Sequence, residues 1–138
     1  AFPRSAVANL EWYADLELFA PRATEPRFFF ACGRTNRDYP TLLQAAARVD
    51  FPITLLVSPA FLQGLAVPPN VTLVPGPVDP GTDHGIDYRR LVEENYGPAL
   101  AVLIPRRHDP DDTCGLTNVL EALAMGKPIV MTRTGCLD

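Results

Sequence analysis

The sequence reads Asp111-Asp112-Thr113-Cys114-Gly115-Leu116-Thr117-Asn118-Val119-Leu120-Glu121-Ala122-Leu123-Ala124-Met125-Gly126-Lys127-Pro128-Ile129-Val130 near its end. An acidic loop leads to a glycine, a helical pattern, a second glycine and an apolar run. The spacing predicts a helix over residues 115–125, with its apolar face formed by Leu116, Val119, Leu120 and Leu123. Glu121 falls on the opposite, outward face, and Gly126 ends the helix in a left-handed conformation. The stretch is therefore a helix followed by a buried strand.

The same alternation of apolar runs and helical patterns begins at Arg27. Strands are expected over 28–32, 53–57, 71–74, 99–104 and 129–132, and helices from Asp38 to about 49, over 60–64, over 87–96 and over 115–125. Near-continuous apolar strands that alternate with helices are typical of a parallel sheet covered on both faces. The sequence predicts an α/β fold, a doubly wound, Rossmann-like parallel sheet with strand order 3-2-1-4-5.

Length and composition favour one globular domain. The chain has 138 residues, 47% of them hydrophobic, and a net charge of -4, which argues against a general nucleic-acid surface. No apolar run is long enough to span a membrane, and three widely spaced cysteines fit neither a disulfide framework nor a zinc site. We expect a cytoplasmic protein. Residues 1–26 are predicted to be an interdomain linker or packing segment, and residues 27–138 a domain cut at both ends.

Basic residues follow the first predicted strand in the loop Gly33-Arg34-Thr35-Asn36-Arg37. In the predicted strand order this loop lies beside loop 105–114, at the point where ligands bind to such sheets. Arg34 and Arg37 could clamp a diphosphate, Gly33 would allow close approach, and the helix beginning near Gly115 would add free N–H groups. The alternative is that both arginines pair with surface carboxylates such as Asp38.

Glu121 has two interpretations. Periodicity places its carboxylate in solvent, whereas a helix face that borders the ligand cleft would let it accept two hydrogen bonds from ribose hydroxyls. In the second case Thr117, one turn earlier, would reach a phosphate oxygen. Gly76, after the third strand, would then border the base.

Other candidate groups carry less weight. Asp109, Asp111 and Asp112 resemble a metal-binding cluster, but acidic residues ahead of a helix are favoured without any metal. His84 and His108 are single loop histidines. Cys114 adjoins a helix start, where a thiol pKa can fall, but no histidine is spaced to support a nucleophile. The dinucleotide and Walker glycine motifs are absent.

The motifs Phe29-Phe30-Ala31-Cys32-Gly33-Arg34, Arg37-Asp38-Tyr39-Pro40-Thr41-Leu42-Leu43-Gln44-Ala45, Gly115-Leu116-Thr117 and Leu120-Glu121-Ala122-Leu123-Ala124-Met125-Gly126-Lys127-Pro128 resemble a known family. Over about residues 13–138 the chain is similar to the C-terminal, donor-binding half of GT-B fold glycosyltransferases, close to family 4. The resemblance implies a retaining hexosyltransferase that uses a UDP- or GDP-type sugar donor, with no catalytic metal and no cofactor.

The resemblance also implies roles for individual residues. The diphosphate-binding positions would be Gly33, Arg34, Arg37, Gly115, Leu116 and Thr117. Glu121 matches the ribose-binding carboxylate that ends the family's motif of two glutamates. The first glutamate of that motif corresponds to Thr113, so the donor sugar would be held by Asp112, Thr113 and Cys114. No catalytic residue is assigned.

Partners follow from the same resemblance. The donor would be a nucleotide-diphosphate sugar, and the acceptor a glycan, a lipid or a small molecule held by an N-terminal domain that this sequence does not contain. A lipid acceptor would place the full protein at the inner face of a membrane. We expect this chain alone to bind the donor weakly and to turn over little. The alternatives are a degenerate, non-catalytic association module of the same fold and, last, an unrelated flavodoxin-like domain.

Overall fold

The computed structural model describes residues 8, 11–74, 87–109 and 112–133. Its core is a five-stranded sheet in which every pairing is parallel. The strands are β1 (Phe28–Cys32), β2 (Ile53–Leu56), β3 (Val71–Val74), β4 (Ala99–Ile104) and β5 (Ile129–Met131), in the order β3-β2-β1-β4-β5. The predicted α/β Rossmann-like fold, with strand order 3-2-1-4-5, is confirmed.

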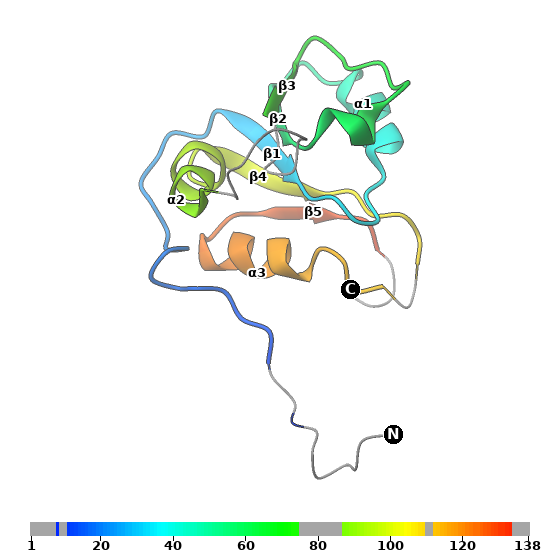
Figure 1. The fold of residues 1–138 in the computed structure, drawn as a ribbon. Coiled ribbons are helices and arrows are strands. Elements are labelled where there is room, and N and C mark those ends of the chain that lie inside the picture. Colours follow the sequence, from blue (N-terminus) through cyan, green and yellow to red (C-terminus); the bar gives the residue numbers. More distant parts are fainter. Residues whose placement is uncertain (1–7, 9–10, 75–86, 110–111, 134–138) are drawn as a thin grey trace.

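Helices cover both faces of the sheet (Figure 1). One face carries α1 (Tyr39–Ala46) and the 3-10 turn η2 (Pro59–Leu62); the other carries α2 (Tyr88–Arg90), the π-helix η3 (Leu91–Tyr96) and α3 (Leu116–Ala124). Each face has its own buried cluster, and the central strand β1 contributes to both, with Phe30 on one side and Ala31 on the other. The apolar run of β1 is explained by this double burial.

Helix α1 follows the predicted pattern. The Asp38 side chain accepts a hydrogen bond from the Thr41 N–H at 3.2 Å, and Pro40 lies in the first turn, where its missing N–H costs nothing. The predicted apolar positions Tyr39, Leu42, Leu43 and Ala46 are all buried. The predicted position Val49 is 46% exposed, because the helix ends before it.

The predicted orientation of α3 is wrong. Leu123, expected against the sheet, is 61% exposed, while Glu121, expected in solvent, is only 6% exposed. The buried side of the helix is formed by Glu121, Ala122 and Met125. Leu116, Val119 and Leu120 are partly buried. Ala122 is small enough to lie directly under the sheet, and the Tyr96 hydroxyl gives the buried carboxylate a donor. The apolar periodicity of the helix does not reveal that Tyr96 is the hydrogen-bond partner of Glu121.

The helical segment predicted over 87–96 is present but changes its hydrogen-bond pattern. It begins as α2, capped by Asp87, and continues as the π-helix η3, in which the Gly97 N–H donates to the Val92 carbonyl at 2.7 Å. π-Helices are rare and are frequent at functional sites. Here the wider turn ends at Tyr96, which is fully buried against the sheet.

Part of the N-terminal segment packs on this face. Phe19 is 4% exposed, and its ring meets Tyr96 edge-on at a centroid distance of 5.8 Å and Tyr88 at 6.4 Å. Trp12 and Tyr13, by contrast, are 63% and 83% exposed. Within this segment Phe19 is therefore buried against the sheet side of the molecule, whereas Trp12 and Tyr13 are not.

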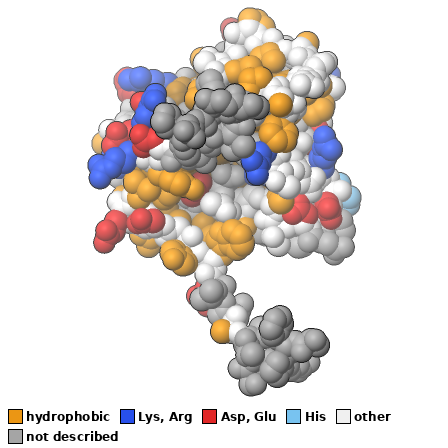
Figure 2. All heavy atoms as spheres, viewed as in Figure 1, with side chains coloured by type: hydrophobic (Ala, Val, Ile, Leu, Met, Phe, Trp, Pro, Cys, Tyr) orange, Lys and Arg blue, Asp and Glu red, His pale blue; other side chains and the backbone are white. Residues whose placement is uncertain are grey.

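Charges of both signs mix on the side of the molecule formed by α2 and η3 (Figure 2). Arg90 and Glu94 form an exposed ion pair at 3.0 Å, one helical turn apart. Such exposed pairs contribute little to stability. Among the helices of the described ranges, none combines the length and apolar character that crossing a bilayer requires.

Replacing Phe19 by Ala should lower the free energy of unfolding by about 3–5 kcal/mol, the usual cost of truncating a buried phenylalanine. The control is Tyr13→Ala, an exposed aromatic of the same segment, which should change stability by less than about 0.5 kcal/mol. Urea denaturation of the three proteins measures both. Equal, small effects would show that the segment is not part of the folded core.

Candidate functional site

The loops that follow β1 and β4 lie side by side. Arg37 and Arg106 form an isolated antiparallel bridge, flanked by hydrogen bonds from the Asp38 N–H to the Pro105 carbonyl at 3.1 Å and from the Arg107 N–H to the Asn36 carbonyl at 3.2 Å. Both loops leave the carboxyl ends of neighbouring strands, where strand order reverses. The predicted juxtaposition of the two loops is confirmed.

Arg37 lies inside this junction and is only 6% exposed. Its guanidinium donates to the Cys32 carbonyl at 3.2 Å, the Thr35 carbonyl at 3.0 Å and the Asn118 side-chain oxygen at 2.6 Å. Over the described residues it forms no ion pair with a carboxylate, so the alternative in which it pairs with Asp38 finds no support. Arg37 braces the loop from within, and contact with a diphosphate stays a prediction for it.

Gly33 is required where it stands. It has a φ of +123°, and a Cβ at this position would lie 2.5 Å from a terminal nitrogen of Arg37. The loop backbone therefore rests directly on the guanidinium. The sequence predicted that the Gly33 backbone would lie close to a ligand; in the structure it lies close to the Arg37 guanidinium.

Asp112 ties three segments together. Its carboxylate accepts hydrogen bonds from the Cys114 N–H at 2.8 Å and from the Asn36 side-chain amide, and lies 3.9 Å from the guanidinium of the buried Arg106. Hydrogen bonds from the Cys114 thiol and Asn36, followed by the Cys114 N–H, lower the pKa of Asp112 to about 2. Its ionised form therefore stabilises the fold above the usual carboxyl pKa, and this is lost as the pH falls toward 2. Its predicted contact with a donor sugar competes with these partners.

The start of α3 adjoins the same junction. Gly115 has a φ of +103°, and a Cβ there would lie 3.0 Å from the Ile104 side chain and 3.7 Å from a terminal nitrogen of Arg37. No side chain caps this helix, and the Leu116 N–H donates to the Thr113 carbonyl at 3.1 Å, so the N–H groups of the first turn that follow Leu116 are the ones left for an outside acceptor. Among the other predicted positions, Thr113 and Thr117 are exposed and Leu116 is partly buried.

Glu121 lies in a buried network rather than at the surface. The Tyr96 hydroxyl donates to its carboxylate at 2.6 Å, and the Asn118 amide nitrogen donates to the Tyr96 oxygen and to the Cys32 sulfur, each at 3.2 Å. Burial raises the pKa of Glu121, against the opposing effect of hydrogen bonds from Tyr96 and Asn118. Contact between Glu121 and a ribose stays a prediction.

Sequence reasoning did not single out Tyr96 or Asn118. Twenty-five residues separate Tyr96 from Glu121, and 81 separate Arg37 from Asn118. No local spacing joins such partners. The available signal was a polar Asn118 directly before the apolar Val119 and Leu120, next to a predicted ligand site.

The two cysteines within the described ranges, Cys32 and Cys114, are unsuited to nucleophilic chemistry. A hydrogen bond to Asp112 and burial raise the pKa of the Cys114 thiol, which corrects the idea that the helix start would lower it. Burial raises the pKa of Cys32 to about 12. Asp109 and His108 are exposed, and within the described ranges no three acidic, histidine or cysteine side chains converge as a metal site. The predicted candidates Gly76, His84 and Asp111 lie outside the described residues.

A basic pocket of about 490 Å3 opens at the carboxyl edge of the sheet. Arg34 and Arg107 are its exposed charged residues, and Arg37 is its buried one. Its lining contains no carboxylate; the full set is Arg34, Thr35, Asn36, Arg37, Tyr39, Pro40, Phe61, Gln63, Leu65 and Arg107. Arg107 was not among the predicted site residues. It joins Arg34 because the loop pairing turns Arg106 inward and its neighbour outward.

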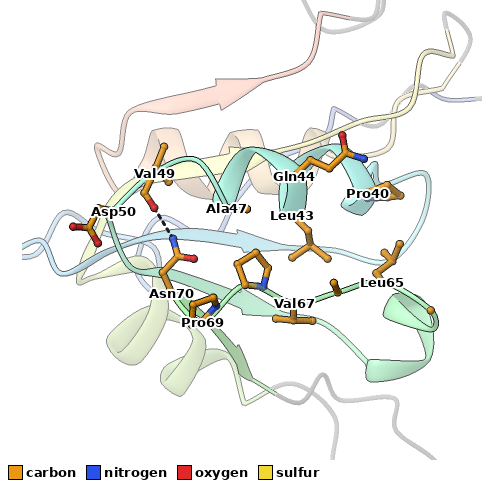
Figure 3. Close-up of a pocket in the computed structure, with 13 residues that line it drawn as sticks. Pro40, Leu43, Gln44, Ala47, Val49, Asp50, Leu65, Val67, Pro69 and Asn70 are labelled. Atoms are coloured by element: carbon orange, nitrogen blue, oxygen red, sulfur yellow. Dashed lines mark hydrogen bonds between the residues drawn. The ribbon is translucent and has the colours of Figure 1, made fainter.

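A second pocket, of about 610 Å3, runs along α1 (Figure 3). Leu43, Ala47, Leu65 and Val67 face into it, and the Asn70 amide closes one end by donating to the Val49 carbonyl at 3.0 Å. Asp50 is its one charged lining residue. An apolar hollow with a carboxylate is unsuited to a phosphate.

Comparison with known proteins finds no family model and no curated protein that matches this chain.

Gly33→Ala should destabilise the protein more than Gly64→Ala. Both glycines have positive φ, +123° and +76°, but a Cβ at Gly64 meets nothing within 4 Å, whereas at Gly33 it collides with Arg37. Gly64→Ala should cost about 1–2 kcal/mol from backbone strain alone, and Gly33→Ala should cost more. Urea denaturation compares them; equal losses would contradict the close packing of Gly33 on the guanidinium.

Glu121→Gln should gain stability relative to the natural protein as the pH rises. Because folding raises the pKa of this carboxyl above its usual 4.5, ionised Glu121 costs stability above that pH, whereas glutamine keeps an oxygen for Tyr96 without a charge. Unfolding free energies at about pH 5 and about pH 8 test this. Glu94→Gln is the control with the opposite trend, because Arg90 lowers the pKa of Glu94. A difference for Glu121→Gln that does not change with pH would contradict the buried carboxylate.

Proposed function

We propose that this chain is the nucleotide-sugar-binding half of a retaining GT-B glycosyltransferase, and that the pocket between the loops after β1, β2 and β4 receives the donor diphosphate. One observation carries the proposal. The pocket holds the exposed Arg34 and Arg107, has no carboxylate in its lining, and opens at the carboxyl edge of a doubly wound sheet. Ligands of such sheets bind at this edge, beside the reversal of strand order.

The charge arrangement supports an anionic ligand. Two exposed guanidiniums can bind phosphate oxygens through planar, charge-assisted hydrogen bonds. Acidic side chains near them would neutralise this attraction, but one acidic group of the junction, Asp112, is bound by Cys114, Asn36 and Arg106. Over the described residues, neither Arg34 nor Arg107 takes part in an ion pair.

The uncapped N-terminus of α3 supplies the second half of the proposed site. The N–H groups that follow Leu116 in its first turn, and the positive end of its dipole, favour an anion by about 0.3–1 kcal/mol each in an exposed setting. Gly115 places this end against the guanidinium of Arg37. During sugar transfer negative charge builds up on the departing diphosphate, and fixed donors of this kind stabilise it. In this account the acceptor comes from another domain.

A non-catalytic association module is the second candidate. Thr113 stands where the family resemblance expects a carboxylate, and several large apolar side chains are exposed, among them Trp12, Tyr13, Leu123 and Val130. These features favour a surface that contacts protein. Such a module would have no need of the basic pocket, so nucleotide binding separates the two candidates.

Isothermal titration with UDP, GDP and ADP tests the proposal. One nucleotide should bind saturably, and Arg34→Ala and Arg107→Ala should each weaken it about tenfold, the usual cost of losing a hydrogen bond to a charged group. Arg48→Ala removes an exposed arginine after the far end of α1 and should leave the affinity unchanged. A folded chain that binds none of the three, or binds one equally well without either pocket arginine, would contradict the proposal.

A further inference from the structure

A continuous chain of hydrogen bonds leads from the loop after β1 to the middle of α3. Arg37 donates to the Asn118 oxygen at 2.6 Å, the Asn118 nitrogen donates to the Tyr96 oxygen at 3.2 Å, and the Tyr96 hydroxyl donates to Glu121 at 2.6 Å. The chain joins three segments that are far apart in sequence. Each link connects one side chain directly to another.

The direction of this chain is set by what each group can do. A guanidinium only donates, and an ionised carboxylate only accepts. Tyr96 has a single proton, which it gives to Glu121, so its oxygen must accept from Asn118. The amide oxygen of Asn118 is thereby turned toward Arg37. A positive and a negative group end the chain, and Asn118 and Tyr96 between them each accept one of its hydrogen bonds and donate the next.

Asn118 lies between the two halves of the proposed anion site. It lies in the first turn of α3, whose N-terminus supplies one half of the proposed anion site. Its partner Arg37 lies under Gly33, in the loop that carries Arg34, the other half. The single 2.6 Å bond between Asn118 and Arg37 therefore spans the two halves. The side chain of Asn118 is partly buried on this inner side of the helix.

We infer that Asn118 and Tyr96 are positioning residues: their side chains hold the loop of Gly33 and Arg34 against the first turn of α3 and do not themselves touch the nucleotide. The effect on nucleotide binding rests on the proposed function. The effect on the position of the loop rests on the contacts alone. Two measurements therefore test the two parts separately.

Nucleotide affinity is the first measurement. Asn118→Leu keeps a side chain of similar size but removes the acceptor of Arg37, and should weaken binding of the nucleotide that the chain prefers by about tenfold. The matched control is Asn95→Leu, which removes another buried asparagine, bonded at 3.4 Å to the Arg90 carbonyl in η3. It should lower stability and leave the affinity of the folded protein unchanged. Equal loss of affinity in both variants would overturn the inference.

Two conservative variants sharpen this result. Asn118→Asp keeps an oxygen for Arg37 and should retain most of the affinity that Asn118→Leu loses. Tyr96→Phe keeps the buried ring but removes the hydroxyl that orients the Asn118 amide, so its affinity should fall between the two. Loss of affinity in Asn118→Asp as large as in Asn118→Leu would show that the acceptor is not what matters.

Hydrogen exchange of the nucleotide-free protein is the second measurement. The Asp38 and Arg107 amides form two backbone hydrogen bonds between the loops, and their exchange should become about tenfold faster in Asn118→Leu than in Asn95→Leu. Unchanged exchange would overturn the positioning role. If the natural chain binds no nucleotide, the proposed function fails, and this exchange result still decides whether Asn118 holds the loop.

Discussion

The guanidinium of Arg37 joins the loop after β1 to helix α3 from inside the protein. An arginine is charged at every accessible pH, and burying its charge is costly unless hydrogen bonds replace the lost water. Three acceptors do so here: the carbonyls of Cys32 and Thr35 and the side chain of Asn118. Because these acceptors belong to the end of β1, the loop and α3, satisfying one cation fixes the geometry of all three.

The other features of the junction follow from this arrangement. Gly33 is required because its backbone rests on the guanidinium, and Gly115 is required because of its φ of +103° and because a Cβ there would lie 3.0 Å from the Ile104 side chain. The pairing of the two loops sends Arg106 into the interior and Arg107 to the surface. The buried Arg37 and Arg106 thus fix the two loops at the edge of the sheet. The exposed Arg34 and Arg107 line the pocket beside them, where we propose that the ligand binds.

The sequence predicted the sheet well for a simple reason. A strand buried on both faces is expected to be almost entirely apolar. This holds for β1 and β4, which have no polar residue, and for β2, in which Thr54 is the single polar residue. The loop juxtaposition followed from topology. These features depend on local pattern and on general rules of chain connection.

The buried hydrogen bonds of the site could not be predicted from local sequence pattern. Leu123 favours burial by its chemistry, but the helix turned the carboxylate of Glu121 inward because Tyr96 offers a proton there. The Tyr96 hydroxyl lies at the end of the π-helix η3, and no spacing of residues in the sequence predicts a π-helical hydrogen-bond pattern. Arg107 became a pocket residue through its backbone pairing with Asn36. Each feature that the sequence did not predict depends on a hydrogen bond between residues that are far apart in the chain.

The most direct test of this account is to map the amide signals of the labelled chain by NMR during titration with UDP and GDP. The account predicts that one nucleotide shifts the amides of the loop from Gly33 to Arg37, of Arg107 and of the first turn of α3, in a single saturable process. Signals of the apolar pocket along α1 should not move. Saturable shifts confined to other surfaces, or none from a folded sample, would contradict the assignment of the basic pocket to a nucleotide diphosphate.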